Sequence, residues 1–364
     1  MKRGILILLV IAAGLLAGNL LIYRKVQADR KDTKTTKIAL IMVGSKNDQS
    51  ICQSQYEAMM SYGEASGTEI VVRENVPPDR FFSNMVEYLI EEGCNIFFFT
   101  SYQYDPYLTK LAEAYPEICF LNANGLETMT NLSSFNGRMY QMRYLMGLIA
   151  GFQSATGEIG YVVAEPVSET IRQVNAFTIG VRKTNPEAQV YVRYTNNWND
   201  AKIAEDVTKD LLREHNIDIL TLHLNTISPL EIADEQGVYT IGNNYDNARL
   251  FPRTYLTASI FDWEPFFAAR ISECERHKFV GRHYWEGIGN GLVTLSPLTG
   301  NVRFNARERV DVEMKKIAEG TYDVFYGPLK DNTGRLRVAQ DENLTDDYLL
   351  YRMNWYVEGV VEEQ

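Results

Sequence analysis

Short apolar runs alternate with longer amphipathic segments along most of this chain, beginning at residue 37. The first run, KIALIMV at 37–43, is followed by Gly44 and Ser45, a pattern typical of a buried strand that ends in a loop. The amphipathic segments after it have helical spacing and stop at glycine or proline. We expect strands at 37–43, 69–73, 95–100 and 118–121, and helices at 53–65, 80–92 and 107–115. This order predicts a parallel, doubly wound α/β sheet.

The same alternation starts again after a seam at 126–138. We expect strands at 158–163, 189–194, 219–222 and 238–241, and helices at 139–155, 168–185, 200–215 and 227–236. Two successive sets of similar size predict two lobes. Late strands at 256–260 and 291–295 predict that the chain returns to the first lobe. We therefore expect an N-terminal lobe made of 37–134 plus about 261–300, and a C-terminal lobe made of 135–260 plus about 301–364.

The N-terminus forms a separate segment. Lys2 and Arg3 precede an uncharged apolar run at 4–23, which is long enough to span a bilayer as a helix. Asn19 stands where a lipoprotein would carry the lipidated cysteine, so ordinary lipidation is impossible there. We expect residues 1–36 to be a retained transmembrane anchor with a polar tether. The alternative is a signal peptide cleaved after the weak site at 26–28.

Charge and motif content argue against several classes of function. The formal net charge of −11 disfavours nucleic acid, because binding phosphates requires clustered Lys and Arg. The four cysteines have no metal-binding spacing, and no common catalytic or phosphate-binding motif occurs. His223 lies in a loop after a predicted strand, but without a partner nucleophile we interpret it as a hydrogen-bonding or packing residue. We expect no enzyme activity, no cofactor and no metal.

The loops after the predicted strands are rich in Asn, Tyr and Trp. In open α/β sheets, ligands bind beyond the carboxyl ends of the strands. Aromatic rings stack on planar ligands, and amides both donate and accept hydrogen bonds. We expect the cleft to be lined by Trp263, Tyr102, Asn124, Asn244 and Asp262, with Asp48, Glu165, Trp198 and Asn225 at its margin. Trp263 is the strongest candidate because a ligand held flat needs an aromatic face; the alternative is that Trp263 packs the hinge.

Ordered sequence motifs resemble the basic membrane protein family of ABC-transporter substrate-binding proteins, in the branch thought to take up purine bases or nucleosides. They run in family order over nearly all of 37–364, and include ENVP (74–77), FNGRMYQMRYLMGLIAG (135–151), ETIRQVNAFTIG (169–180), TNNWND (195–200), HLNTISP (223–229) and TASIFDWEPFF (257–267). The resemblance implies a periplasmic-binding-protein-like type I fold. Two Rossmann-like lobes would then close on the ligand about a hinge.

The sequence departs from the family pattern at several ligand positions. Asp48 is present in the first loop, but Ile51 stands where relatives carry a stacking aromatic residue. Glu165 occupies a position that is often Phe, and Asn244 replaces an Asp that binds ribose. Asp262 and Trp263 align with a Lys of the nucleoside branch. The exact ligand therefore cannot be carried over, and a free base or a non-purine ligand fits as well as a nucleoside.

The resemblance leads to a specific functional expectation. We expect an extracytoplasmic binding protein that holds a small, planar, polar ligand between its lobes and presents it to an ABC permease. The N-terminal segment would hold the protein at the outer face of the cell membrane, or would be removed to release a secreted protein. The alternative function is a membrane-anchored sensor that uses the same lobes to signal to a membrane partner.

Overall fold

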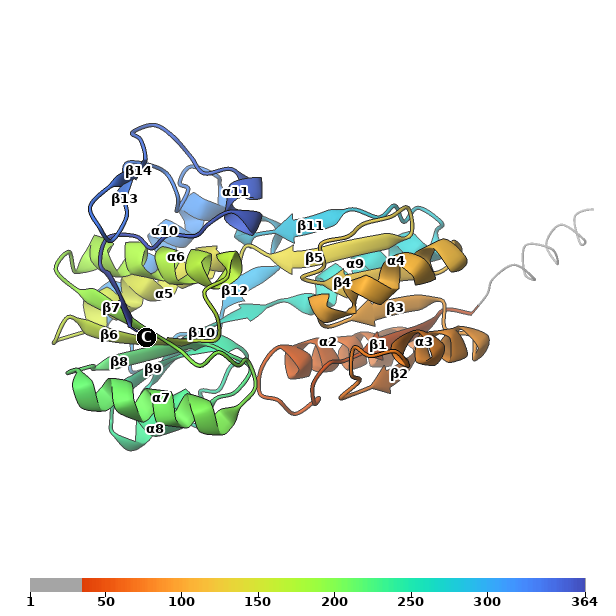
Figure 1. Ribbon diagram of the computed structural model, residues 1–364, viewed down its shortest axis with the longest axis horizontal. Coiled ribbons are helices and arrows are strands. Elements are labelled where there is room, and N and C mark those ends of the chain that lie inside the picture. Colours follow the sequence, from red (N-terminus) through yellow and green to blue (C-terminus); the bar gives the residue numbers. More distant parts are fainter. Residues whose placement is uncertain (1–34, 364) are drawn as a thin grey trace, which may run out of the picture.

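The computed structural model describes residues 35–363 and contains two parallel-stranded lobes that lie end to end (Figure 1). The predicted N-terminal anchor falls outside these residues, apart from the end of its tether at 35–36. Within 35–363, none of the helices combines the length and the hydropathy that a membrane crossing requires. The predicted α/β fold with two lobes is confirmed.

The first lobe is a six-stranded, fully parallel sheet in the order β11-β5-β4-β3-β1-β2. Its β3 segment, IFFF, is buried at every position, as expected for a parallel strand covered on both faces. The strands are β1 (Lys37–Ile41), β2 (Glu69–Arg73), β3 (Ile96–Phe99), β4 (Cys119–Ala123), β5 (Leu132–Gly137) and β11 (His283–Glu286). The helices are α2 (Ile51–Ser66), α3 (Phe82–Glu91), α4 (Asp105–Ala114) and α9 (Trp263–Glu275), with a short 3-10 turn η1 (Tyr102–Tyr104).

The second lobe is a seven-stranded sheet in the order β12-β10-β9-β8-β6-β7-β15, in which only β12 is antiparallel to its neighbour. Its strands are β6 (Glu158–Val163), β7 (Gln189–Tyr194), β8 (Ile219–His223), β9 (Tyr239–Asn244), β10 (Tyr255–Phe261), β12 (Val293–Leu295) and β15 (Val360–Glu363). Its helices are α5 (Met139–Gln153), α6 (Ser168–Thr184), α7 (Ala201–Glu214), α8 (Ser228–Glu235), α10 (Phe304–Ala318) and α11 (Asp346–Tyr351).

The chain passes between the lobes where β5 leads into α5, where β10 leads into α9, and where β11 leads through η2 (Ile288–Asn290) into β12. The strand expected at 291–295 was predicted to return to the first lobe, and this was wrong. It forms β12, which pairs with β10 in the second sheet. The return is made by α9 and β11 instead. The segment 126–138, interpreted as a seam, contains β5, an inner strand of the first sheet.

A C-terminal segment completes the second lobe. The hairpin of β13 (Leu329–Lys330) and β14 (Leu336–Val338) leads to α11, which packs on α6, and β15 then pairs with β7 at the sheet edge (Figure 1). Asp346 on α11 forms an ion pair at 2.5 Å with Arg138, which lies between β5 and α5. The C-terminal segment therefore reaches from the outer edge of the second lobe to one of the hinge connections.

A buried carboxylate joins three helices of the second lobe. Glu313 of α10 is fully buried and lies 2.9 Å from the Tyr144 hydroxyl, 3.2 Å from Lys183 and 2.9 Å from Lys316. Burial alone would raise the pKa of Glu313, but the hydrogen bonds from Lys316 and Tyr144 and the charge of Lys183 outweigh it and lower this pKa to about 2. Glu313 therefore stabilises the lobe in its ionised form.

Glu313→Gln is expected to reduce the free energy of unfolding at pH 7 by about 1–3 kcal/mol, because a charge-assisted hydrogen-bond network is lost. The carboxylate titrates near 2 in the folded chain instead of 4.5. Its stabilisation is present above pH 4.5 and disappears as the pH falls toward 2. Urea unfolding at pH 7, 4 and 3 should show the wild-type and variant curves converging as the pH falls. Glu308→Gln, at an exposed position of the same helix, is the control. A stability difference independent of pH would contradict the prediction.

Candidate ligand-binding site

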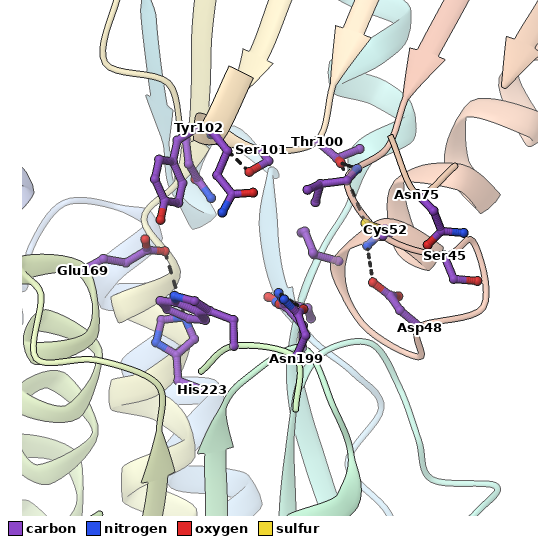
Figure 2. A pocket seen from close by; sticks show the side chains of 18 residues that line it. Ser45, Asp48, Cys52, Asn75, Thr100, Ser101, Tyr102, Glu169, Asn199 and His223 are labelled. Atoms are coloured by element: carbon purple, nitrogen blue, oxygen red, sulfur yellow. Dashed lines mark hydrogen bonds and ion pairs between the residues drawn. The ribbon is translucent and has the colours of Figure 1, made fainter. Parts of the chain in front are cut away.

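A cavity of about 480 Å³ lies between the lobes, at the carboxyl ends of strands from both sheets (Figure 2). From the first lobe it receives the loop after β1, one residue after β2, the segment after β3 and one residue after β4. From the second lobe it receives the start of α6 and the ends of β7, β8 and β9. Its lining comprises Val43, Gly44, Ser45, Asp48, Ile51, Cys52, Asn75, Thr100, Ser101, Tyr102, Gln103, Asn124, Glu169, Trp198, Asn199, His223, Asn225 and Asn244.

Asp48 organises the first-lobe wall of this cavity. Its carboxylate accepts hydrogen bonds from the backbone N–H groups of Ser50 (2.8 Å), Cys52 (3.0 Å) and Gln53 (3.0 Å), at the start of α2. Burial raises the pKa of Asp48, and these hydrogen bonds oppose the shift. The orphan N–H groups at the start of a helix need such an acceptor. Asp48 therefore holds the loop in place and has most of its acceptor capacity occupied.

Backbone geometry presents two of the cavity's asparagines. Asn124 and Asn244, which follow or end β4 and β9, adopt left-handed conformations with φ of 57° and 62°. Asn tolerates this region better than most residues. The turn directs the chain away from the sheet directly after each strand, so both residues lie at the sheet edge that faces the cavity.

Aromatic and amide groups line the second-lobe wall. Trp198 contacts His223 edge to face, with ring centroids 5.3 Å apart. Asn225 donates a hydrogen bond of 3.0 Å to the side chain of Asn199, which ties the loop after β8 to the loop after β7. From the first lobe, Tyr102 faces the same region with 48% of its surface exposed. The cavity therefore offers two aromatic rings, one from each lobe.

A group of charged residues lies at one end of the cavity. Glu169, in the first turn of α6, has a side chain that is 32% exposed, and its carboxylate is 4.0 Å from Nε2 of His223. Behind them, Arg143 of α5 and Arg172 of α6 are 0% and 2% exposed. Figure 2 shows Glu169 and His223 together across the cavity from Asp48 and Cys52.

Burial and the two arginine charges together shift the pKa values of His223 and Glu169. Burial, followed by the positive charges of Arg143 and Arg172, lowers the pKa of His223 well below 6.5, so its imidazole is neutral at pH 7. Burial raises the pKa of Glu169, and the charges of Arg172 and Arg143 oppose that rise. The burial effect is the larger of the two, so the pKa of Glu169 lies above its usual value, and the two guanidinium charges limit the rise.

The structure brings together most of the residues expected from the sequence. Six of them line the central cavity: Tyr102, Asn124, Asn244, Asp48, Trp198 and Asn225. Asp262 and Trp263 instead border a separate, more open depression of about 580 Å³. Glu165 lines neither of these two hollows.

Trp263, the strongest candidate from the sequence, does not line the central cavity. Its side chain is only 3% exposed, and its ring stacks on Phe261 at 4.1 Å and lies parallel to Phe267 at 5.7 Å. Its indole N–H donates to the Ser54 hydroxyl at 3.1 Å. With its surface covered by protein, Trp263 has no ring face left for a ligand in this conformation. It packs the connection between β10 and α9, which was the alternative interpretation.

Sequence reasoning missed Glu169 and undervalued His223. Glu169 lies one residue beyond the strand-end loop at 164–168, in the first turn of the helix, where charge patterning alone suggests only a favourable helix start. His223 was interpreted as a hydrogen-bonding or packing residue, and it is indeed 93% buried, yet it also lines the cavity. Within residues 35–363, no cluster of His, Cys, Asp and Glu side chains is arranged to hold a metal ion.

Comparison with known proteins gives this geometry a context. Residues 35–322 match the model of the Bmp family, described as PnrA-like ABC transporter substrate-binding proteins. A purine-binding protein from Brucella abortus is 29% identical over 326 residues, which cover 89% of this chain and 92% of that protein. A Haloferax volcanii protein named for glucose binding by an ABC transporter is 29% identical over 269 residues, which cover 74% of this chain and 66% of that protein.

A solved structure shares the fold. The solute-binding protein of an ABC transporter system from Conexibacter woesei superimposes with a TM-score of 0.68 at 19% identity. The superposition covers 79% of this chain and 98% of that one. The two-lobed arrangement described above is therefore that of ABC solute-binding proteins.

Proposed function

Because this chain belongs to the Bmp family of PnrA-like ABC transporter substrate-binding proteins, we propose that it captures a purine base or nucleoside for an ABC importer. The general role follows from the family: such proteins bind a small solute outside the cytoplasm and deliver it to a membrane permease. Membership in a solute-binding family supports binding rather than catalysis. The identity of the solute and the manner of membrane attachment are the proposed parts.

The observation that carries the proposal is the composition of the central cavity. Tyr102 comes from the first lobe and Trp198 from the second, and five asparagines surround them. A flat heteroaromatic ligand would be held by stacking on the rings, while the amides would bond to the donors and acceptors at its edges. Closure of the lobes about the hinge would bury such a ligand and bring both walls onto it.

A hexose is the second candidate ligand, because the Haloferax volcanii relative named for glucose binding is as identical to this chain as the purine-binding one. Sugars also pack on aromatic rings and bond to amides. The two candidates differ in their edges: a hexose presents hydroxyl groups all round, whereas a purine presents N–H groups and nitrogen lone pairs in a plane. A direct competition between the two therefore separates them.

We also propose that the apolar run at 4–23 holds the protein at the outer face of the cell membrane. Fractionation tests this attachment. Full-length protein should stay with the membranes after washing with high salt and with alkali, and release by either treatment would contradict the anchor. A mature N-terminus beginning after residue 28 would support cleavage instead.

Titration calorimetry on the full-length protein tests the ligand. The protein is purified in mild detergent and unfolded and refolded to remove bound solutes, then titrated with adenine, guanine, hypoxanthine, guanosine and glucose. We expect at least one purine to bind, and Tyr102→Ala to weaken that binding by about 5- to 150-fold, since stacking contributes about 1–3 kcal/mol. Tyr88→Ala on α3 is the control, because Tyr88 is 54% exposed and does not line the cavity. Binding of glucose without any purine would overturn the purine proposal.

A further inference from the structure

The two carboxylates that line the central cavity differ in what they have left to offer a ligand. Asp48 already accepts hydrogen bonds from three backbone N–H groups. Glu169 accepts none from the part of the chain that the structure describes, and Nε2 of His223 lies 4.0 Å from its carboxylate in the cavity wall. Its side chain is 32% exposed at the cavity. Glu169 is therefore the strong acceptor that remains for a ligand.

Two buried arginines lie near Glu169, and their charges oppose the rise in its pKa that burial causes. Arg172 lies one helical turn further along α6, donates a hydrogen bond to the Leu349 carbonyl of α11, and lies over the Trp285 ring at 5.4 Å. Arg143 donates to the Asn243 side chain, next to the cavity residue Asn244, and lies over the Tyr161 ring at 5.7 Å. Neither arginine lines the cavity. Their charges therefore act on Glu169 from fixed positions, without contacting a ligand themselves.

The imidazole of His223 does not neutralise the carboxylate of Glu169. His223 is buried among the same positive groups and is neutral at pH 7, because burial and the charges of Arg143 and Arg172 lower its pKa. At 4.0 Å it is also beyond hydrogen-bond distance of Glu169. An ionised carboxylate can only accept hydrogen bonds. Whatever part of a ligand meets the ionised carboxylate of Glu169 must therefore donate.

The position of Glu169 relative to the aromatic rings defines which part of a planar ligand meets it. Figure 2 shows Tyr102 above Glu169 and His223 below it, and Trp198 contacts His223. A flat ring held by Tyr102 and Trp198 would thus direct one of its edges, rather than a face, toward the carboxylate. The two carboxylate oxygens suit two parallel N–H donors, the arrangement by which arginine binds carboxylates.

We propose that Glu169 makes the cavity selective for purines that carry two adjacent N–H donors on one edge, that is, guanine-type 2-amino-6-oxopurines. The inference rests on the proposed purine-binding function. Guanine presents its N1–H and a 2-amino N–H side by side. Hypoxanthine offers N1–H alone, and adenine turns the lone pair of N1 toward the carboxylate. Affinity should decrease in the order guanine, hypoxanthine, adenine. The N1 lone pair of adenine would face the carboxylate of Glu169, and neither acceptor would then have a hydrogen-bond donor.

The wild-type protein tests the selectivity without any substitution. Full-length, ligand-free protein is titrated with guanine, 1-methylguanine, hypoxanthine and adenine. We expect guanine to bind about 10- to 100-fold more tightly than adenine. 1-Methylguanine should bind more weakly than guanine by a similar factor, because it has lost a hydrogen bond to a charged group. Equal affinities for guanine, 1-methylguanine and adenine would overturn the inference and leave purine binding intact. Failure of every purine to bind would overturn the proposed function, and the inference with it.

Glu169→Gln tests the residue itself. Glutamine keeps the size but offers one acceptor and one donor. Guanine affinity should therefore fall by about 10- to 100-fold, while adenine affinity should rise, because the amide N–H can donate to the N1 lone pair of adenine. Glu187→Gln is the control, because Glu187 follows the other end of α6, is exposed and does not line the cavity. Melting curves show whether each variant is folded. A folded Glu169→Gln protein that still prefers guanine by the wild-type factor would overturn the assignment.

Discussion

Replacing Trp263 by alanine is expected to lower the free energy of unfolding by about 3–5 kcal/mol, the range for truncating a large buried aromatic side chain. The ring is 3% exposed and packs against Phe261, Phe267 and Phe135. Its removal leaves a cavity at the connection from β10 to α9 and leaves the Ser54 hydroxyl without its donor. Urea unfolding of the empty protein measures the loss. Affinity of the folded fraction should stay within about threefold of wild type, since Trp263 does not line the central cavity.

Trp198→Ala is the matched comparison, because it removes the same side chain from the cavity wall. It should weaken ligand binding by about 5- to 150-fold through lost stacking and should destabilise the empty protein less than Trp263→Ala. The two variants thus separate packing from binding. If a folded Trp263→Ala protein binds the ligand more than about tenfold more weakly than wild type, Trp263 contacts the ligand when the lobes are closed.

Gly147→Ala should destabilise the second lobe by about 3 kcal/mol or more, beyond the usual range for overpacking. A Cβ atom at Gly147 would lie 2.0 Å from the Phe177 carbonyl oxygen, and one at Gly180 would lie 2.1 Å from the Tyr144 carbonyl oxygen. Helices α5 and α6 therefore touch backbone to backbone, and neither can move without disturbing the sheet that they cover. In an open helix the same substitution would stabilise by about 0.5–1 kcal/mol, so the sign of the effect is diagnostic.

Gly300→Ala is the control for this prediction, since no atom lies within 4 Å of its added Cβ. Thermal and urea unfolding of both variants measure the difference. Stability of Gly147→Ala equal to that of the control would mean that α5 and α6 do not pack at this distance. Gly180→Ala approaches the same contact from the other helix and should give an effect of similar size.

Periodicity in the sequence located several strands with little error. The observed bounds of β2, β6 and β7 are the predicted ones, 69–73, 158–163 and 189–194. These segments are short runs rich in Val, Ile and Tyr between amphipathic helices, and that local pattern is sufficient to set the bounds of a strand.

Strands with polar residues escaped the same reasoning. The β5 segment LSSFNG carries two serines and an asparagine, yet its first four residues are buried. The Ser134 hydroxyl donates to the Gly125 carbonyl at 2.5 Å, and the Ser133 hydroxyl accepts from the Arg282 backbone N–H at 3.2 Å. Partners distant in the sequence satisfy these groups, so no local pattern could identify the strand. β11 pairs with β5, so its place in the sheet also depends on a strand that the sequence pattern did not identify.

The residues of the candidate site also divide into those whose place the sequence predicted and those whose place depended on tertiary packing. The rule that ligands bind beyond the carboxyl ends of strands placed Tyr102, Asn124, Trp198, Asn225 and Asn244 near one another, because parallel strands end at one edge of a sheet. It also selected Trp263, which follows β10, but the packing of Phe261 and Phe267 around that ring is invisible in the sequence.

The alternation of apolar runs and amphipathic helices was enough to determine two α/β lobes and the edge at which their loops meet, since both follow from local burial. The tertiary structure decided which lobe each late strand joins, which aromatic rings remain open to a ligand, and which carboxylate stays free. Glu169 shows the reason most clearly. Burial raises the pKa of its carboxyl, the charges of Arg172 and Arg143 oppose that rise, and Arg172 is bonded to a carbonyl 177 residues away in α11. Such long-range contacts exist only after the chain has folded, so their effect on a ligand could not be read from the residues alone.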